Sequence, residues 1–211
     1  MKNSMQHWNG NQLCMIDCET TSLDITRGEI IQLAILPLDS NIEPRQDVEP
    51  FCIYMQPRYP DRVEEEALKV NGITMEELFS KGFDQDVAID LLESWIVKLD
   101  LPHNKYGRPK KIIPAGQNYV GFDKFFLMRW LGQSHYDELF DYHVPDTMCT
   151  ACYLNDRAAM RGDTVPFSKV NLTYLASTLK IPHERAHDAL QDAFVAAQVY
   201  KRMLGMGGLL A

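Results

Sequence analysis

The apolar run at residues 13–16 (Leu-Cys-Met-Ile), followed directly by Asp17-Cys18-Glu19, is the feature that most constrains the fold. A short apolar run of this kind is typical of a strand that is buried on both faces. Because side chains alternate along a strand, Asp17 and Glu19 point to the same face. Two carboxylates in a buried setting repel each other, and they stay ionised only where a cation or strong hydrogen-bond donors compensate them. The stretch therefore predicts half of a metal site.

Length and composition favour one globular domain over residues 1–211, with flexible ends at 1–11 and 205–211. Hydrophobic residues make up 45% of the chain and charged residues 24%, and no run approaches the ~20 apolar residues of a membrane span. Five irregularly placed cysteines indicate reduced thiols and a cytoplasmic protein. Cys149 and Cys152 form a Cys-x-x-Cys pair, but without a second pair we do not interpret it as a zinc or redox site.

The net charge of −8 is unusual for a protein that binds nucleic acid, because such proteins commonly carry a basic face. One local basic cluster contains Lys105, Arg108, Lys110 and Lys111, and we interpret it as a solvated loop. If the partner is a nucleic acid, the acidic charge favours a short or end-only substrate, from which few phosphates need to be neutralised.

The chain alternates between strand and helix patterns. Strands are expected at 13–16, 29–37, 51–55, 112–115 and 142–145, and short links between the first three predict an antiparallel meander. A helix is expected at 63–70, and a capping box at Thr74 predicts the start of a second, short helix. Further helices are expected at 84–99, 122–131, 147–160, 171–180 and 189–204.

The second half of the predicted metal site lies at residues 186–193. Asp188 is followed three residues later by Gln191, a variant capping box that makes Asp188 the N-cap of a helix. His187 then precedes the cap and Asp192 is the fourth helical residue, the two positions whose side chains meet in a hydrophobic staple. The spacing therefore places a proton acceptor beside a candidate metal ligand.

Asp123 also lies in a first helical turn, where a single acid is explained equally well by the helix dipole. The complete set is more informative than any member: Asp17, Glu19, Asp123 and Asp192 offer four carboxylates, with His187 beside the last. Carboxylate oxygens favour Mg²⁺ or Mn²⁺ over zinc. Two such ions about 3.5–4 Å apart are the usual arrangement for phosphodiester hydrolysis, and a histidine can accept the proton of the attacking water at neutral pH.

Three motifs in order resemble those of the DEDDh 3′–5′ exonuclease superfamily. They are Asp17-x-Glu19-Thr20-Thr21, then Asn118 with Phe122-Asp123 and Phe126-Leu127, then His187-x-Ala189-x-x-Asp192-Ala193. The histidine five residues before the final aspartate is that of the DEDDh branch. The middle motif is closer in spacing to exonuclease I and oligoribonuclease than to proofreading subunits. Together the motifs span most of the chain, which implies a single exonuclease domain.

The resemblance implies an α/β, ribonuclease H-like fold, with a five-stranded mixed sheet and helices on both faces. It also implies that Asp17, Glu19 and Asp192 hold two Mg²⁺ or Mn²⁺ ions. Asp123 would join them, partly through water, and His187 would act as general base.

The resemblance extends to the substrate-binding residues. Thr20 and Thr21 would hold the 3′-terminal nucleotide, with Asn118 and Phe122 also at the substrate. A role for Phe122 as a core aromatic is equally compatible with the sequence.

We therefore expect a metal-dependent 3′–5′ exonuclease that releases nucleoside monophosphates from single-stranded 3′ ends. DNA is favoured as the substrate, with a role in DNA repair, and a homodimer or an association with a polymerase is possible. One alternative is an oligoribonuclease-like enzyme acting on short RNA. From a different class, the alternative is a non-catalytic module that binds nucleic acid or a polymerase.

Overall fold

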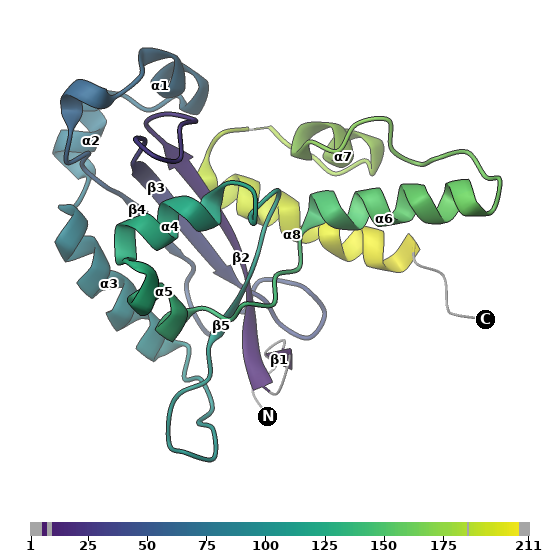
Figure 1. Cartoon of the computed structure of the whole chain (residues 1–211), viewed down its shortest axis with the longest axis horizontal. Helices are drawn as coiled ribbons and strands as arrows, with labels where there is room; N and C mark the ends of the chain where they lie inside the picture. The colour runs from purple at the N-terminus through teal and green to yellow at the C-terminus, as the bar shows by residue number, and fades with distance from the viewer. Residues whose placement is uncertain (1–5, 8–9, 185, 207–211) are drawn as a thin grey trace.

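The computed structural model describes residues 6–7, 10–184 and 186–206 and contains a central mixed β-sheet with helices on both faces (Figure 1). The strands are β1 (Gln6–His7), β2 (Asn11–Thr20), β3 (Ile30–Pro37), β4 (Phe51–Tyr54) and β5 (Ile112–Ala115). The helices are α1 (Glu65–Asn71), α2 (Met75–Lys81), α3 (Gln85–Lys98), α4 (Asp123–Leu131), α5 (Gln133–Leu139), α6 (Thr147–Met160), α7 (Leu172–Thr178) and α8 (Ala189–Met206), with a 3₁₀ turn, η2 (Pro60–Arg62). The predicted α/β fold class is confirmed.

Strand β2 is the centre of the five-stranded sheet. It pairs antiparallel with β3 and parallel with β5, and β3 pairs antiparallel with β4, so the predicted meander is confirmed. Strand β1 pairs antiparallel with the first residues of β2. Strand β5 pairs only with residues 12–15, so it leaves the edge of β2 uncovered beyond Met15. This uncovered edge lies beside the acidic residues of β2.

The prediction of a strand at 142–145 is wrong. Asp146, just after this segment, makes only an isolated bridge with the chain after β5. Asp141 accepts a hydrogen bond from the backbone amide of His143 (3.0 Å), which turns the chain locally, and Pro145 has no N–H to donate. The fifth strand is β1, which lies in the segment where a flexible end was expected.

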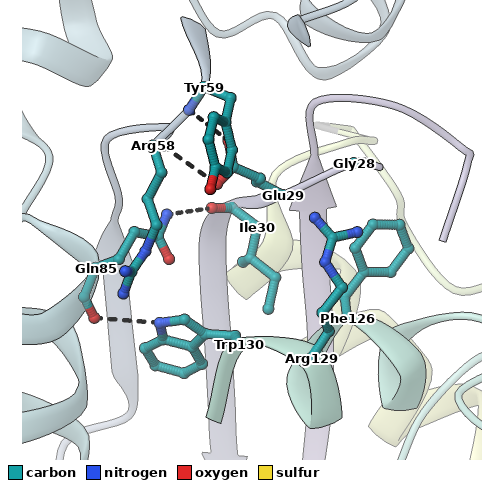
Figure 2. A pocket seen from close by; sticks show the side chains of 9 residues that line it. All are labelled: Gly28, Glu29, Ile30, Arg58, Tyr59, Gln85, Phe126, Arg129 and Trp130. Atoms are coloured by element: carbon teal, nitrogen blue, oxygen red, sulfur yellow. Dashed lines mark hydrogen bonds between the residues drawn. The ribbon is translucent and has the colours of Figure 1, made fainter. Parts of the chain in front are cut away.

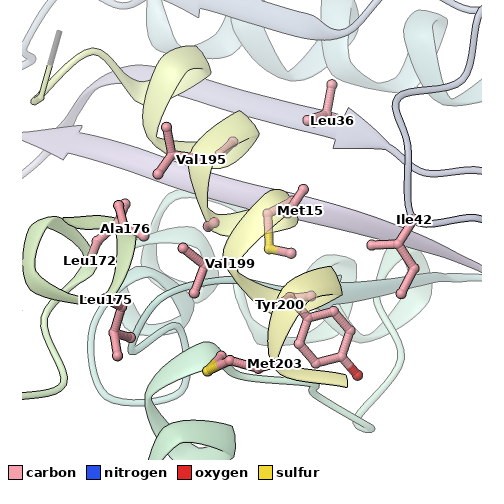
Figure 3. Packing of buried hydrophobic residues seen from close by; sticks show 14 of the residues in the cluster. Met15, Leu36, Ile42, Leu172, Leu175, Ala176, Val195, Val199, Tyr200 and Met203 are labelled. Atoms are coloured by element: carbon pink, nitrogen blue, oxygen red, sulfur yellow. The ribbon is translucent and has the colours of Figure 1, made fainter. Parts of the chain in front are cut away.

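The apolar residues of β2 alternate between two cores, one on each face of the sheet. Leu13 and Met15 lie in the core beneath α6, α7 and α8, with Val195 and Val199 of α8 packed against the sheet (Figure 3). Cys14, Ile16 and Cys18 of β2 lie in the core beneath α3, α4 and α5. Both cores exclude water from β2, as expected for a strand buried on both faces.

Helix ends follow the local sequence. Thr74 and Glu77 form the predicted capping box of α2, and Asp146 caps α6 by accepting hydrogen bonds from two backbone amides. Helix α5 was not predicted. Gly132, with φ of 80°, separates it from α4, and a single buried side chain, Tyr136, ties this short helix to the core.

Of the ends that were expected to be flexible, residues 1–5, 8–9 and 207–211 lie outside the described residues. Helix α8 continues to Met206. None of the described helices is long and apolar enough to cross a membrane.

Candidate active site

Asp17 and Glu19 lie near the end of β2, on the strand that the rest of the sheet surrounds. Glu19 is buried, with 6% of its surface exposed. Burial, followed by the carboxylates of Asp192, Asp123 and Asp188, raises the pKa of Glu19 to about 8. The pKa of Asp17 is also raised well above its usual range, first by burial and then by the neighbouring carboxylates. The two carboxyl groups therefore lie in a strongly acidic environment.

Asp123, the first residue of α4, binds the uncovered edge of β2. Its Oδ1 accepts a hydrogen bond from the backbone amide of Cys18 (3.0 Å), an amide that β5 is too short to reach. Burial raises the pKa of Asp123 to about 7, although hydrogen bonds from its own amide and that of Cys18 oppose the rise. Asp123 is thus held next to Asp17 and Glu19, at the point where the pairing of β2 with β5 ends.

The start of α8 holds the fourth acid. Asp188 accepts a hydrogen bond from the amide of Gln191 (3.0 Å), as expected of the predicted N-cap. Asp192 accepts one from the amide of His187 (3.1 Å). His187 has φ of 69°, a left-handed conformation that residues other than glycine adopt rarely and that is enriched at functional sites. This conformation turns the chain into α8 with His187 and Asp192 on the same side.

These segments bring three predicted residues into one cluster. Ligand atoms of Glu19, His187 and Asp192 all lie within 4.8 Å of one another. Glu19 and Asp192 are buried, whereas His187 is exposed. Asp17 and Asp123 are outside this cluster, but Asp123 raises the pKa of Glu19, and Glu19 and Asp192 raise the pKa of Asp17, so both carboxylates are close to it. All five predicted residues therefore lie in one acidic region that solvent reaches on the side of His187.

Two residues at this site were not predicted from the sequence. His183 Nε2 lies 2.6 Å from Asp192 Oδ1, and its side chain is only 6% exposed. The other ring nitrogen of His183 is buried and has no hydrogen-bond partner within the described chain. Gln32 of β3 accepts a hydrogen bond from the amide of Ala189 (3.1 Å) and so fixes the start of α8 against the sheet. The one sequence signal for His183 is its position four residues before the predicted His187.

The predicted substrate-binding threonines are buried and hold the loop after β2 together. Thr20 donates to the carbonyl of Ser22 (2.9 Å), and the Thr20 carbonyl accepts from the side chain of Asn71 in α1 (3.0 Å). The Thr21 hydroxyl accepts from the amide of Glu29 (2.9 Å). Their hydroxyl groups are therefore used within the protein, where they fix the loop that follows β2.

Asn118 and Phe122 lie on the turn that enters α4. Asn118 has φ of 61°, which asparagine tolerates better than most residues. Phe122 is half-buried, and its ring packs on that of Phe126 with 4.8 Å between centroids. Phe122 is thus a peripheral core aromatic that keeps part of its surface exposed near Asp123.

A pocket of about 230 Å³ lies behind the loop of residues 21–29 that follows the threonines (Figure 2). The Glu29 carboxylate accepts hydrogen bonds from the backbone amides of Arg58 (3.2 Å) and Tyr59 (3.0 Å). Arg129 of α4 donates to two backbone carbonyls of the same loop (3.2 and 3.1 Å). The charged groups around this pocket therefore hold the loop in place through hydrogen bonds to the backbone.

The donor set fits a hard divalent cation. It contains carboxylate oxygens and one imidazole, and no thiolate, because Cys18 faces the opposite core. The raised pKa values of Asp17, Glu19 and Asp123 show that the protein groups leave the negative charge uncompensated. A divalent cation is the compensation that such a cluster favours.

Comparisons with known proteins agree with this geometry. The chain matches the RNase T exonuclease family over residues 14–200. No curated protein matches it significantly.

Among solved structures, E. coli exonuclease I in complex with a dA16 oligonucleotide matches with a TM-score of 0.70 at 20% identity, over 92% of this chain and 41% of that one. Exonuclease I from Methylocaldum szegediense matches with a TM-score of 0.70 at 21% identity, over 92% of this chain and 40% of that one. Cell-death related nuclease 4 (CRN-4) matches with a TM-score of 0.69 at 20% identity, over 93% and 64%.

These structural likenesses concern the fold, and this chain spans about two fifths of the length of exonuclease I. The family match covers most of the chain and all three acidic motifs. The chain belongs to the RNase T exonuclease family.

Proposed function

We propose that the protein is a metal-dependent 3′–5′ exonuclease that releases nucleoside monophosphates from single-stranded 3′ ends, with DNA as its preferred substrate. The observation that carries the proposal is the cluster of Glu19, His187 and Asp192 within 4.8 Å, surrounded by further acids with raised pKa values. Oligonucleotide complexes of exonuclease I support single-stranded DNA as the substrate.

In this proposal Asp17, Glu19 and Asp192 hold two Mg²⁺ or Mn²⁺ ions, and Asp123 joins them, partly through water. When bound, the ions lower the pKa of a water molecule and stabilise the leaving oxygen. His187, the exposed member of the cluster, accepts the proton of that water at a ring nitrogen.

The water oxygen attacks the terminal phosphorus, and the bond from phosphorus to the 3′ oxygen of the preceding nucleotide breaks. The leaving oxygen takes up a proton, so the products are a nucleoside 5′-monophosphate and a strand that is one nucleotide shorter. The loop held by Thr20 and Thr21 receives the terminal nucleotide, with Asn118 and the exposed part of Phe122 beside the strand.

The test is hydrolysis of a 5′-labelled single-stranded DNA in Mg²⁺. We expect a ladder of labelled products that shorten one nucleotide at a time, abolished by a chelator and by Asp17→Asn. Asp156→Asn, which removes an exposed carboxylate on α6, is the matched control and keeps full activity. Immediate release of the label as a mononucleotide would show that hydrolysis starts at the 5′ end and would refute the proposed 3′–5′ direction. Intact 3′ ends would refute the nuclease proposal in favour of a binding module.

A second candidate function is hydrolysis of short RNA, as in an oligoribonuclease. The observation that favours it is the net charge of −8, because an acidic protein binds few phosphates. Matched RNA and DNA substrates of several lengths separate the two functions. The homodimer, the polymerase association, the role in DNA repair and the cytoplasmic location stay predictions, and light scattering of the purified protein measures the first.

A further inference from the structure

We propose that the loop between α3 and β5, residues 102–111, binds single-stranded nucleic acid upstream of the 3′ end that enters the active site. We call this loop the basic hairpin. The proposal rests on the proposed function, because it assigns a second contact to the same substrate. It also revises our interpretation of this basic cluster as a solvated loop.

The basic hairpin has a defined conformation. His103 and Pro109 form an antiparallel bridge, and the amide of Asn104 donates to the carbonyl of Arg108 (2.7 Å). The side chain of Asn104 accepts hydrogen bonds from the amides of Tyr106 (2.9 Å) and Arg108 (3.1 Å). Figure 1 shows this loop extending beyond the sheet at the end where β5 begins. Its side chains are therefore presented to solvent by a folded turn.

Charge is distributed unevenly between the hairpin and the rest of the protein. The chain carries a net charge of −8, yet residues 101–122 contain four lysines and arginines and no aspartate or glutamate. All four cations lie in the basic hairpin. A polyanion that approaches this acidic protein is consequently attracted to the hairpin.

The cations at the tip of the hairpin are available to a ligand. Lys105 and Arg108 are exposed and Lys110 is half-buried, and within the described residues none of the three is in an ion pair. Lys111 differs, because its Nζ donates to the carbonyl of Asp137. Tyr106 is 76% exposed, with the Lys105 Nζ 4.9 Å from its ring centroid. An exposed aromatic ring among free cations is the combination that single-strand binding proteins use to stack bases and neutralise phosphates.

The position of the hairpin sets a minimum substrate length. The amide of Gln12 binds the carbonyl of Lys111 at one end of β2, and Glu19 lies seven residues further along the same strand. At about 3.3 Å per residue, the hairpin begins about 23 Å from the candidate active site. At about 3.4 Å per stacked nucleotide, a strand needs at least roughly seven nucleotides to reach the base of the hairpin from the active site, and more to reach its tip. Shorter substrates reach only the active site.

The experiment tests whether the effect of removing the hairpin charges on KM depends on the length of the substrate. The hairpin variant is Lys105→Gln/Arg108→Gln/Lys110→Gln. The control variant changes the net charge equally, at three exposed cations, one directly after α6 and two on α8: Arg161→Gln/Lys201→Gln/Arg202→Gln. The substrates are dT4 and dT20 in Mg²⁺. We expect the hairpin variant to raise KM for dT20 at least tenfold, with kcat unchanged, and to hydrolyse dT4 like the unmodified protein.

Two further measurements sharpen the test. The slope of log KM against log salt for dT20 falls in magnitude by about 2 in the hairpin variant, because three phosphate contacts are lost. Tyr106→Ala, which keeps all the charges, raises KM for dT20 at least about fivefold through lost stacking.

The proposal is overturned if the hairpin variant and the control variant hydrolyse dT20 with the same KM, or if dT4 and dT20 are affected equally. Hydrolysis by the unmodified protein then still supports the proposed function. If the unmodified protein hydrolyses neither substrate, the proposed function fails. Fluorescence anisotropy of labelled dT20 in a chelator then decides the hairpin proposal, with at least tenfold weaker binding by the hairpin variant expected and equal binding by both variants refuting it.

Discussion

Replacing Glu19 by glutamine tests whether the acidic cluster is a source of instability that a metal ion relieves. Burial and the carboxylates of Asp192, Asp123 and Asp188 raise the pKa of Glu19 from 4.5 to about 8. An acid whose pKa is higher in the folded protein binds more protons when folded, so its contribution to stability is lost as the pH rises. The loss extends from about pH 4.5 to about pH 8.

The size of this effect follows from the pKa difference. At about 1.4 kcal/mol per pKa unit, Glu19 alone lowers the free energy of unfolding by about 3–4 kcal/mol between pH 5 and pH 8 in metal-free protein. Glutamine has nearly the same shape and no charge. We therefore expect Glu19→Gln to be more stable than the unmodified protein at pH 8 by up to about 4 kcal/mol, and to differ from it by less than about 1 kcal/mol at pH 5.

Urea unfolding in a chelator at both pH values measures the difference. Glu138→Gln, which neutralises an exposed carboxylate on α5, is the control and should leave the stability at both pH values unchanged. Added Mg²⁺ should stabilise the unmodified protein at pH 8 more than it stabilises Glu19→Gln, because the ion binds the folded carboxylates. If Glu19→Gln is no more stable than the unmodified protein at pH 8 in a chelator, the reasoning from carboxylate repulsion is refuted.

Two other substitutions test neighbouring features. His183→Ala should weaken the apparent Mg²⁺ affinity by about 10–100-fold, because the ring no longer orients the Asp192 carboxylate, and His183→Gln should restore part of it. A Mg²⁺ titration of thermal stability measures this, with the half-exposed His135→Ala as control, and an unchanged affinity in His183→Ala contradicts it. Asp146→Ala removes the N-cap of α6 and should lower the free energy of unfolding by about 1 kcal/mol without changing the Mg²⁺ affinity. Urea unfolding checks the first part, and equal stability would contradict it.

Most of the fold could be predicted because its signals are local. The apolar run at 13–16 indicates a buried strand, and the caps at Thr74, Asp146 and Asp188 depend on residues within one turn of the helix start. The wrong strand at 142–145 and the missed helix α5 are short segments, where one Asx turn or one buried tyrosine outweighs the pattern. Segments of this length carry too few residues for periodicity to decide between strand, helix and loop.

Those residues of the candidate site that lie in motifs with fixed spacing could be predicted from the sequence. The structure brings Glu19, His187 and Asp192 together, with Asp17 and Asp123 adjacent. Gln32 and His183 could not be found in this way. The contact between Gln32 and Ala189 joins residues 157 positions apart, and His183 lies in a loop that has no periodicity.

The uncovered edge of β2 also has a consequence for when the acidic cluster is completed during synthesis of the chain. Asp123 reaches that edge across 105 residues, and α8 docks on Gln32 only after a further 66 residues have been made. Contacts between such distant residues form late in folding, because closing long loops is slow. A growing chain therefore has its carboxylates apart until α8 is in place. The same topology that assembles the acidic cluster leaves that cluster incomplete until the last helix has been made.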